Sequence, residues 1–164
     1  MKNHNGQILT TTPFASWYVY HESLLWPETL MRIREICERQ VEEEGTVHGD
    51  RIAPEIRKNK VAFINDEELF SIIRPFMNGV NKESGWNFDI TAIENLQYTV
   101  YYGGDDHYDW HADTVIEDKS FGPNGPEDSP TKNTIRKMSC SIQLSHPDEY
   151  EGGELEFVQL VKGA

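Results

Sequence analysis

The chain has 164 residues, of which 37% are hydrophobic and 11% aromatic, so it is long enough and apolar enough to bury a core as one domain. Its formal net charge of −13 disfavours a nucleic-acid partner, because binding to phosphate backbones uses clustered Lys and Arg. No run approaches the length of a membrane span and the N-terminus has no apolar stretch of the kind found in signal peptides, so we expect no membrane association.

The two cysteines, Cys37 and Cys140, lie in segments with an apolar pattern. We expect both to be buried free thiols, since a disulfide has no support in the spacing. Free thiols suit a reducing compartment, so we expect a cytoplasmic location.

The N-terminal part predicts an extended segment and then a helix. Residues 8–20 are rich in β-branched and aromatic side chains, which favour extended backbone. Pro27 opens a helical pattern that we expect to end at Gly45. The apolar positions that define its face are Leu30, Ile33, Cys37 and Val41.

A loop, a strand and a second helix are predicted next. Residues 51–60 read as a loop, and KVAFI at 60–64 reads as a short strand. Asp66 begins a helix that continues to Asn81, although Pro75 is expected to strain or kink it. Its apolar face comprises Leu69, Ile72, Ile73 and Phe76.

The second half of the chain is rich in strand signals. Residues 86–90 and 138–145 alternate between apolar and polar side chains, and 93–102 is rich in β-forming residues. Gly152 and Gly153 form a turn that leads into a further strand at 154–158. Helices followed by a run of strands predict a mainly β, α+β domain: an antiparallel sandwich or barrel backed by N-terminal helices.

The triplet His111-Ala112-Asp113 is a candidate metal site. On a strand, residues i and i+2 point to the same face, so both side chains can reach one ion. With one further histidine, this donor set becomes the two-histidine, one-carboxylate arrangement that leaves positions open on Fe(II) for oxygen chemistry. The alternative is a polar strand end whose histidine is satisfied by hydrogen bonds. A calcium loop is disfavoured because the nearby acids lack the required spacing.

From Gln97 to Phe157 the chain resembles the Fe(II)- and 2-oxoglutarate-dependent oxygenases, in particular their prolyl-hydroxylase-like branch. The resemblance rests on QYTVYYGGDDHYDWHAD at 97–113 and RKMSCSIQLSHPDEYEGGELEF at 136–157. It implies a double-stranded β-helix, or jelly roll, within a single domain at 1–164. Residues 1–90 would form a strand and helical part, and 91–164 a jelly-roll core without its last strands.

The resemblance also implies roles for single residues. His111 and Asp113 match iron ligands, and Tyr102 matches a tyrosine that contacts 2-oxoglutarate. Tyr108 matches an aromatic residue beside the cosubstrate pocket, with packing as an equal alternative. The polar face of 138–145 would line the cavity, and from it we take Gln143 as a cofactor-binding candidate.

The implied reaction hydroxylates a C–H bond, in a prolyl or other peptidyl side chain or in a small molecule, and releases succinate and CO2. Its cofactors would be Fe(II), 2-oxoglutarate and O2, with ascorbate as a candidate addition. Arg136 matches an arginine that lines the substrate groove, with a structural ion pair as the alternative. The loop at 115–134 is a candidate lid, because long loops in small domains often cover binding sites.

The chain departs from the family pattern after the hairpin at Gly152 and Gly153. The resemblance calls there for a second histidine and then a basic residue for the far carboxylate of 2-oxoglutarate, and residues 158–164 match neither. We therefore expect a partial copy that binds Fe(II) and 2-oxoglutarate weakly and turns over little. The alternatives are a noncatalytic jelly-roll module for binding or assembly, with a vestigial metal site, and a cupin-like metal protein. The sequence leaves the substrate and the oligomeric state open.

Overall fold

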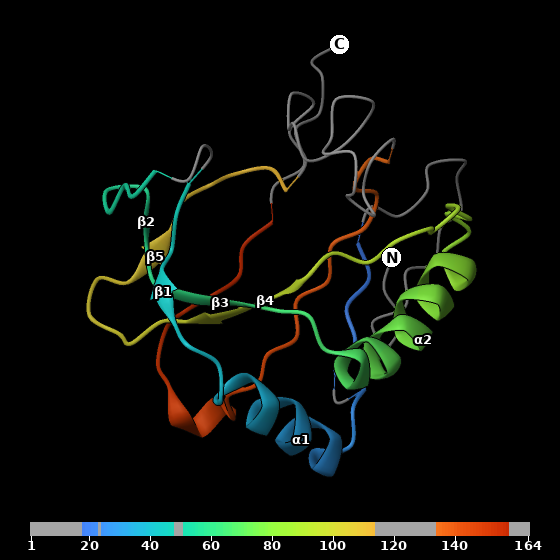
Figure 1. The fold of residues 1–164 in the computed structure, drawn as a ribbon, viewed down its shortest axis with the longest axis horizontal. Helices are drawn as coiled ribbons and strands as arrows, with labels where there is room; N and C mark the ends of the chain where they lie inside the picture. The colour runs from blue at the N-terminus through green and yellow to red at the C-terminus, as the bar shows by residue number, and fades with distance from the viewer. Residues whose placement is uncertain (1–17, 23, 48–50, 114–133, 158–164) are drawn as a thin grey trace.

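The computed structural model describes residues 18–22, 24–47, 51–113 and 134–157, and Figure 1 shows their arrangement. Within these ranges, neither α-helix is long and apolar enough to cross a membrane. The elements in chain order are α1 (Pro27–Cys37), β1 (Glu43–Glu44), β2 (Arg57–Lys58), β3 (Lys60–Ile64), α2 (Glu67–Glu83), β4 (Leu96–Val100), β5 (His107–Tyr108) and the 3-10 helix η1 (Pro147–Glu149).

The described strands form two small antiparallel sheets. One has the order β1-β3-β4, and its long pairing runs from Lys60 opposite Val100 to Ile64 opposite Leu96. The other pairs β2 with β5. This is an α+β arrangement with antiparallel sheets, as predicted, whereas the jelly roll stays a prediction.

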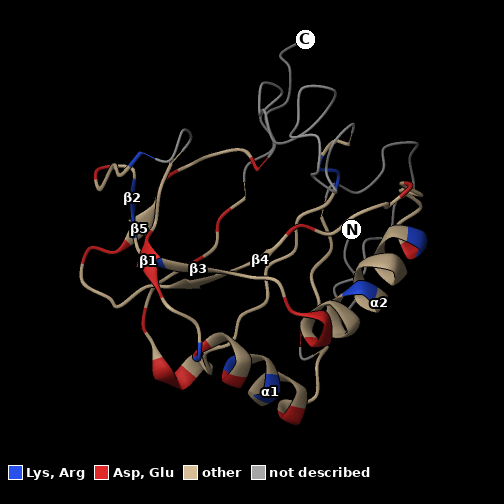
Figure 2. Ribbon diagram, viewed as in Figure 1, with Lys and Arg blue, Asp and Glu red and all other residues tan. Residues whose placement is uncertain are grey.

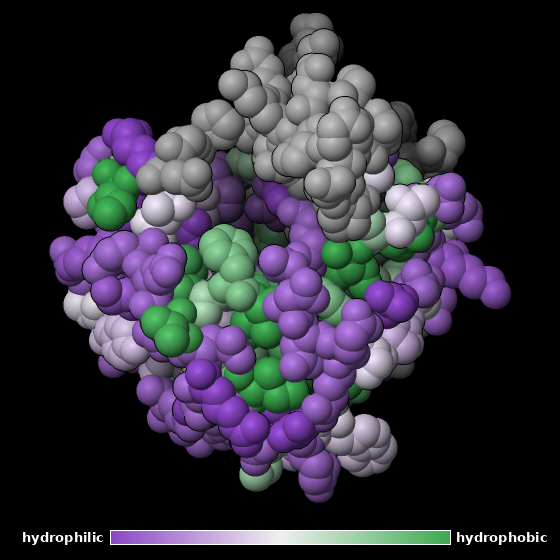
Figure 3. All heavy atoms as spheres, in the orientation of Figure 1, coloured by the Kyte–Doolittle hydropathy of each residue, from purple (hydrophilic) through white to green (hydrophobic). Residues whose placement is uncertain are grey.

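The core lies between the two helices and the β3–β4 pair. Both helices lie on the same side of this pair, which runs across the middle of the view in Figure 1. The buried cluster consists of Ile33, Ile36, Cys37, Ile64 and Leu69, with Leu25, Ile72, Leu96, Tyr98 and Leu144 packed against it. Apolar side chains remain visible in the middle of the face shown in Figure 3, framed by hydrophilic residues.

The predicted start of the second helix is confirmed. Asp66 is the N-cap of α2, and its carboxylate accepts a hydrogen bond from the Leu69 backbone N–H at 3.0 Å. Such a cap satisfies a donor that has no partner within the helix. Pro75 lies inside α2, and Leu69 on the predicted apolar face is buried.

The first helix is shorter than predicted, because it ends at Cys37 rather than near Gly45. Val41, expected on its apolar face, is 84% exposed. The sequence after the helix holds Glu42, Glu43 and Glu44, whose negative charges are unfavourable at a helix C-terminus. Glu43 and Glu44 instead form β1, paired with the start of β3.

Two further predictions for the middle of the chain were wrong. The predicted loop at 51–60 contains β2. The predicted strand at 86–90 is irregular, and Asn87 has a positive φ of 52°. The Asn81 side chain explains this, because its amide binds both the backbone N–H and the carbonyl of Phe88, which a neighbouring strand would otherwise bind.

In the C-terminal part the predicted strands at 138–145 and 154–157 are irregular within the described residues. The alternation persists only in part: Met138, Ile142 and Leu144 are half-buried, whereas Cys140 is exposed. Cys140 is therefore not the buried thiol that we expected, while Cys37 is buried, and both are free. Of the predicted extended segment at 8–20, residues 8–17 lie outside the described residues, and 18–20 are not in a strand.

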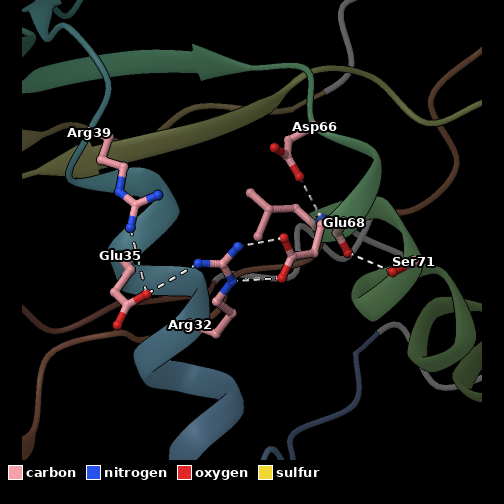
Figure 4. A network of polar contacts seen from close by, with 7 residues as sticks. Arg32, Glu35, Arg39, Asp66, Glu68 and Ser71 are labelled. Atoms are coloured by element: carbon pink, nitrogen blue, oxygen red, sulfur yellow. Dashed lines mark hydrogen bonds and ion pairs between the residues drawn. The ribbon is translucent and has the colours of Figure 1, made fainter.

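Charged side chains connect α1 to its neighbours. Arg32 donates from Nε and Nη2 to the two carboxylate oxygens of Glu68, both at 2.7 Å, and thereby links α1 to α2 (Figure 4). Arg34 binds Glu149 of η1 at 2.9 Å. Figure 2 shows charges of both signs on α1 and α2, whereas β1 and η1 are acidic.

Candidate metal centre

The segment that carries the candidate ligands is positioned by the chain reversal between β4 and β5. Gly103 and Gly104 have positive φ values of 90° and 73°, a conformation that glycine adopts without a steric penalty. The carboxylate of Asp106 accepts a hydrogen bond from the Tyr102 backbone N–H and closes the turn. The chain then pairs with β2, and the Asp109 N–H donates to the Ile56 carbonyl at 2.9 Å.

His111 and Asp113 lie beyond β5, so the regular strand that we predicted for them is wrong. Their side chains nevertheless converge. His111 Nε2 lies 3.5 Å from Asp113 Oδ1, and the two side chains are 41% and 52% exposed. Metal ligation by this pair stays a prediction.

The imidazole of His111 is oriented with Nε2 toward Asp113. His111 Nδ1 lies 2.8 Å from the carbonyl oxygen of Asp109. A carbonyl only accepts, so this hydrogen bond places a ring N–H on Nδ1, and in the neutral imidazole Nε2 then carries the lone pair. Histidines that bind metals commonly use their second nitrogen in this way.

The donor pair fits a borderline divalent ion with a small adjustment. Ligand bonds of about 2.1 Å at right angles place neighbouring donor atoms about 3 Å apart. The observed 3.5 Å therefore closes by a small side-chain rotation, which two partly exposed side chains allow. Among the residues that the structure describes, no third histidine, cysteine or acid joins the pair.

Tyr108 lies directly against the candidate ligand. Its ring stacks on the His111 imidazole, with the ring centroids 3.7 Å apart and the planes inclined by 14°. This contact gives Tyr108 a packing role, and the role beside a cosubstrate stays a prediction.

Arg136 approaches the site from the C-terminal segment and makes an ion pair. Its Nε donates to Glu94 Oε1 at 2.7 Å, and its Nη2 pairs with the other oxygen of the same carboxylate. Its Nη1 donates to the Asp113 carbonyl. The alternative role of Arg136, a structural ion pair, is thus present. Contact of Arg136 with a substrate stays a prediction.

The two cosubstrate candidates are placed differently. The Tyr102 hydroxyl donates to Glu42 Oε2 at 2.7 Å, and this hydrogen bond raises the pKa of Tyr102 above its ordinary value. Gln143 is exposed in the irregular segment that follows Arg136. The candidate lid at 115–134 lies outside the described residues, apart from Thr134.

Sequence reasoning did not identify three residues that support the candidate ligands. The Asp109 carbonyl accepts from His111, and the Glu94 carboxylate accepts from Arg136. Arg57 Cζ lies 4.4 Å from the centroid of the Tyr108 ring. A backbone acceptor carries no signal in the sequence, and the partners Glu94 and Arg57 are 42 and 51 residues away from the groups that they contact. In the sequence, the one hint of these contacts was an aromatic residue, Tyr108, close to His111.

Comparison with known proteins gives one distant similarity. The chain is 26% identical over 138 residues to a protein of Nitrosomonas europaea named PKHD-type hydroxylase. The matched region covers 82% of this chain and 56% of that protein, so the chain spans about half the length of its relative. No protein-family model matches the chain, and no solved structure matches it.

Proposed function

We propose that this chain belongs to an Fe(II)- and 2-oxoglutarate-dependent dioxygenase that hydroxylates a C–H bond, in a prolyl or other peptidyl side chain. The observation that carries the proposal is the convergence of His111 Nε2 and Asp113 Oδ1 to 3.5 Å in a short exposed segment. The named hydroxylase among known proteins and the resemblance over 97–157 support the same class.

The chain's own residues would hold and orient the metal. His111 Nε2 and an oxygen of Asp113 are its two ligands here, and the Asp109 carbonyl fixes the ring nitrogen that faces it. The Tyr108 ring covers one face of the imidazole and keeps water from that face. When bound, Fe(II) with 2-oxoglutarate and O2 supplies the oxidising equivalents for hydroxylation, with release of succinate and CO2.

Tyr102 is our proposed contact for a cosubstrate carboxylate. Its hydroxyl already donates to a carboxylate, that of Glu42, and this hydrogen bond raises the pKa of Tyr102, so the protonated donor form is favoured. A dicarboxylate cosubstrate would replace Glu42 as the acceptor. Gln143 is proposed to contribute to the cosubstrate side, and Arg136, which also donates to the Asp113 carbonyl, to line the substrate groove.

The proposal is tested by titrating the metal-free chain with Mn(II), followed by the EPR signal of the free ion, with and without 2-oxoglutarate. We expect weak binding that tightens when 2-oxoglutarate is present, because the cosubstrate adds donor atoms to a site with two protein ligands. His111→Gln should weaken binding more than about 10-fold, the lower range for loss of even an indirect support of a metal site.

His21→Gln is the matched control, since it removes a histidine outside the candidate site. Its affinity should equal that of the wild type. Mn(II) binding that is indifferent both to 2-oxoglutarate and to His111→Gln would contradict the proposal. It would favour the alternative, a noncatalytic module for binding or assembly.

A further inference from the structure

Arg57 is a buried cation that the sequence pattern did not single out. Arg57 is 7% exposed and lies on the two-residue strand β2. Within the described residues, its guanidinium has hydrogen bonds to Asn59 Oδ1 at 3.1 Å and to the Thr46 carbonyl at 2.8 Å. Its Nη2 is buried without a hydrogen-bond partner there. Among the described residues no carboxylate pairs with this guanidinium, so its other contacts contribute to holding it in the interior.

That interaction is with the ring of Tyr108. Arg57 Cζ lies 4.4 Å from the Tyr108 ring centroid, and the His111 ring centroid lies 3.7 Å from it. Two planar groups this close to one centroid do not fit on the same face of the ring. Tyr108 is therefore held between the guanidinium and the imidazole, with a cation–π contact on one side.

The backbone and the neighbours of Arg57 keep this stack in place. Arg57 and Tyr108 are directly paired residues of β2 and β5. Arg57 also packs against Gly45, where an added Cβ would lie 2.8 Å from Arg57 Nε and 2.0 Å from Asn59 Oδ1. Tight packing and two hydrogen bonds thus leave the guanidinium little freedom to move.

We propose that Arg57 is a positioning residue for the candidate metal ligand. It fixes the Tyr108 ring by the cation–π contact, and the ring in turn fixes the plane of the His111 imidazole, whose Nε2 faces Asp113. The metal-related part of this inference rests on the proposed function, whereas the stack itself does not. A ligand held in its binding orientation before the ion arrives loses less conformational freedom on binding.

The stack is tested first without metal, by NMR of the full chain labelled on histidine. The ring current of Tyr108 should shift the carbon-bound ring protons of His111 upfield, and His111→Gln assigns these signals. Arg57→Met removes the cation and Arg57→Lys keeps a charge without the planar group, and both should move the signals toward the values of an exposed histidine. Lys82→Met, which removes an exposed cation on α2, is the control and should leave them unchanged.

Circular dichroism and thermal unfolding show whether each variant folds. If Arg57→Met does not fold, Arg57→Lys alone decides the test, since it retains the aliphatic stem and the charge. His111 signals that are unshifted in the wild type, or equally shifted in the folded Arg57 variants, would overturn the inference. Mn(II) affinity is the second readout: Arg57→Lys should weaken it about 10-fold while Lys82→Met does not. If the wild type binds no Mn(II), the proposed function fails while the NMR result still decides whether the stack orients His111.

Discussion

Asn81 shows how one buried side chain determines the course of the backbone. It is 9% exposed near the end of α2, and its side-chain amide both donates to the Phe88 carbonyl and accepts from the Phe88 N–H, each at 2.9 Å. These two bonds replace the ladder that a strand at 86–90 would need. The irregular path of this segment follows from them.

Replacing Asn81 should therefore destabilise the fold clearly. Asn81→Ala leaves the Phe88 N–H and carbonyl without these partners, and we expect a loss of about 1–3 kcal/mol in the free energy of unfolding. Urea denaturation measures it. Asn78→Ala, at an exposed asparagine of the same helix, should change stability by less than about 0.5 kcal/mol. Equal effects of the two variants would show that the Phe88 bonds are unimportant.

Gly45 offers a second test at the residue scale, because the space beside it is filled. Gly45→Ala would place its Cβ 2.0 Å from Asn59 Oδ1, so Asn59 and Arg57 must shift. We expect a loss of about 1–3 kcal/mol in the free energy of unfolding, as for other overpacked sites.

Gly79→Ala is the matched change for this test, since no atom lies within 4 Å of its added Cβ and the position is inside α2. It should stabilise the chain by up to about 1 kcal/mol through helix propensity. A Gly45→Ala protein that is as stable as the wild type would contradict the close packing around Arg57.

At the scale of elements, the contact between α1 and α2 depends on pH. The hydrogen bonds from Arg32 lower the pKa of Glu68 below its ordinary value. A lowered carboxyl pKa contributes stability above the unfolded-state pKa near 4.5, and the contribution disappears as pH falls through the folded-state value. Both side chains are partly exposed, so the effect should be small and reduced by salt.

Glu68→Gln tests this contact, with the melting temperature measured from neutral to acidic pH at low salt. The variant should melt below the wild type at pH 7, and the difference should vanish at a pH below the lowered pKa of Glu68. Glu67→Gln, in the same first turn of α2, is the control. A difference that stays constant with pH would show that charge pairing is not its cause.

The elements that the sequence predicted correctly are those with local signals. KVAFI at 60–64 is β3, and the capping aspartate at Asp66 marks the start of α2. β2 and β5 were not predictable, because each is two residues long and exists only through its pairing with a partner about 50 residues away. The alternating segment at 138–145 predicted a strand that is not formed among the described residues, since alternation shows which side chains can be buried but not whether a neighbouring strand is there.

At the scale of the whole molecule, the predicted ligands His111 and Asp113 converge even though the predicted strand beneath them is absent. The sequence pointed to this pair because their side chains are chemically distinctive and closely spaced. It did not point to the residues from other elements that contact the site, among them Arg57 of β2, which contacts Tyr108, and Glu94, which binds Arg136. The placement of such supports depends on the tertiary fold, which single-residue patterns do not contain.

The central claim is that His111 and Asp113 bind one divalent ion, and pulsed EPR of Mn(II) bound to a chain labelled with 15N-histidine tests it most directly. Coupling to one imidazole nitrogen should appear, should vanish in His111→Gln, and should persist in His21→Gln. Coupling that remains in His111→Gln, or bound Mn(II) with no imidazole coupling in the wild type, would contradict the claim.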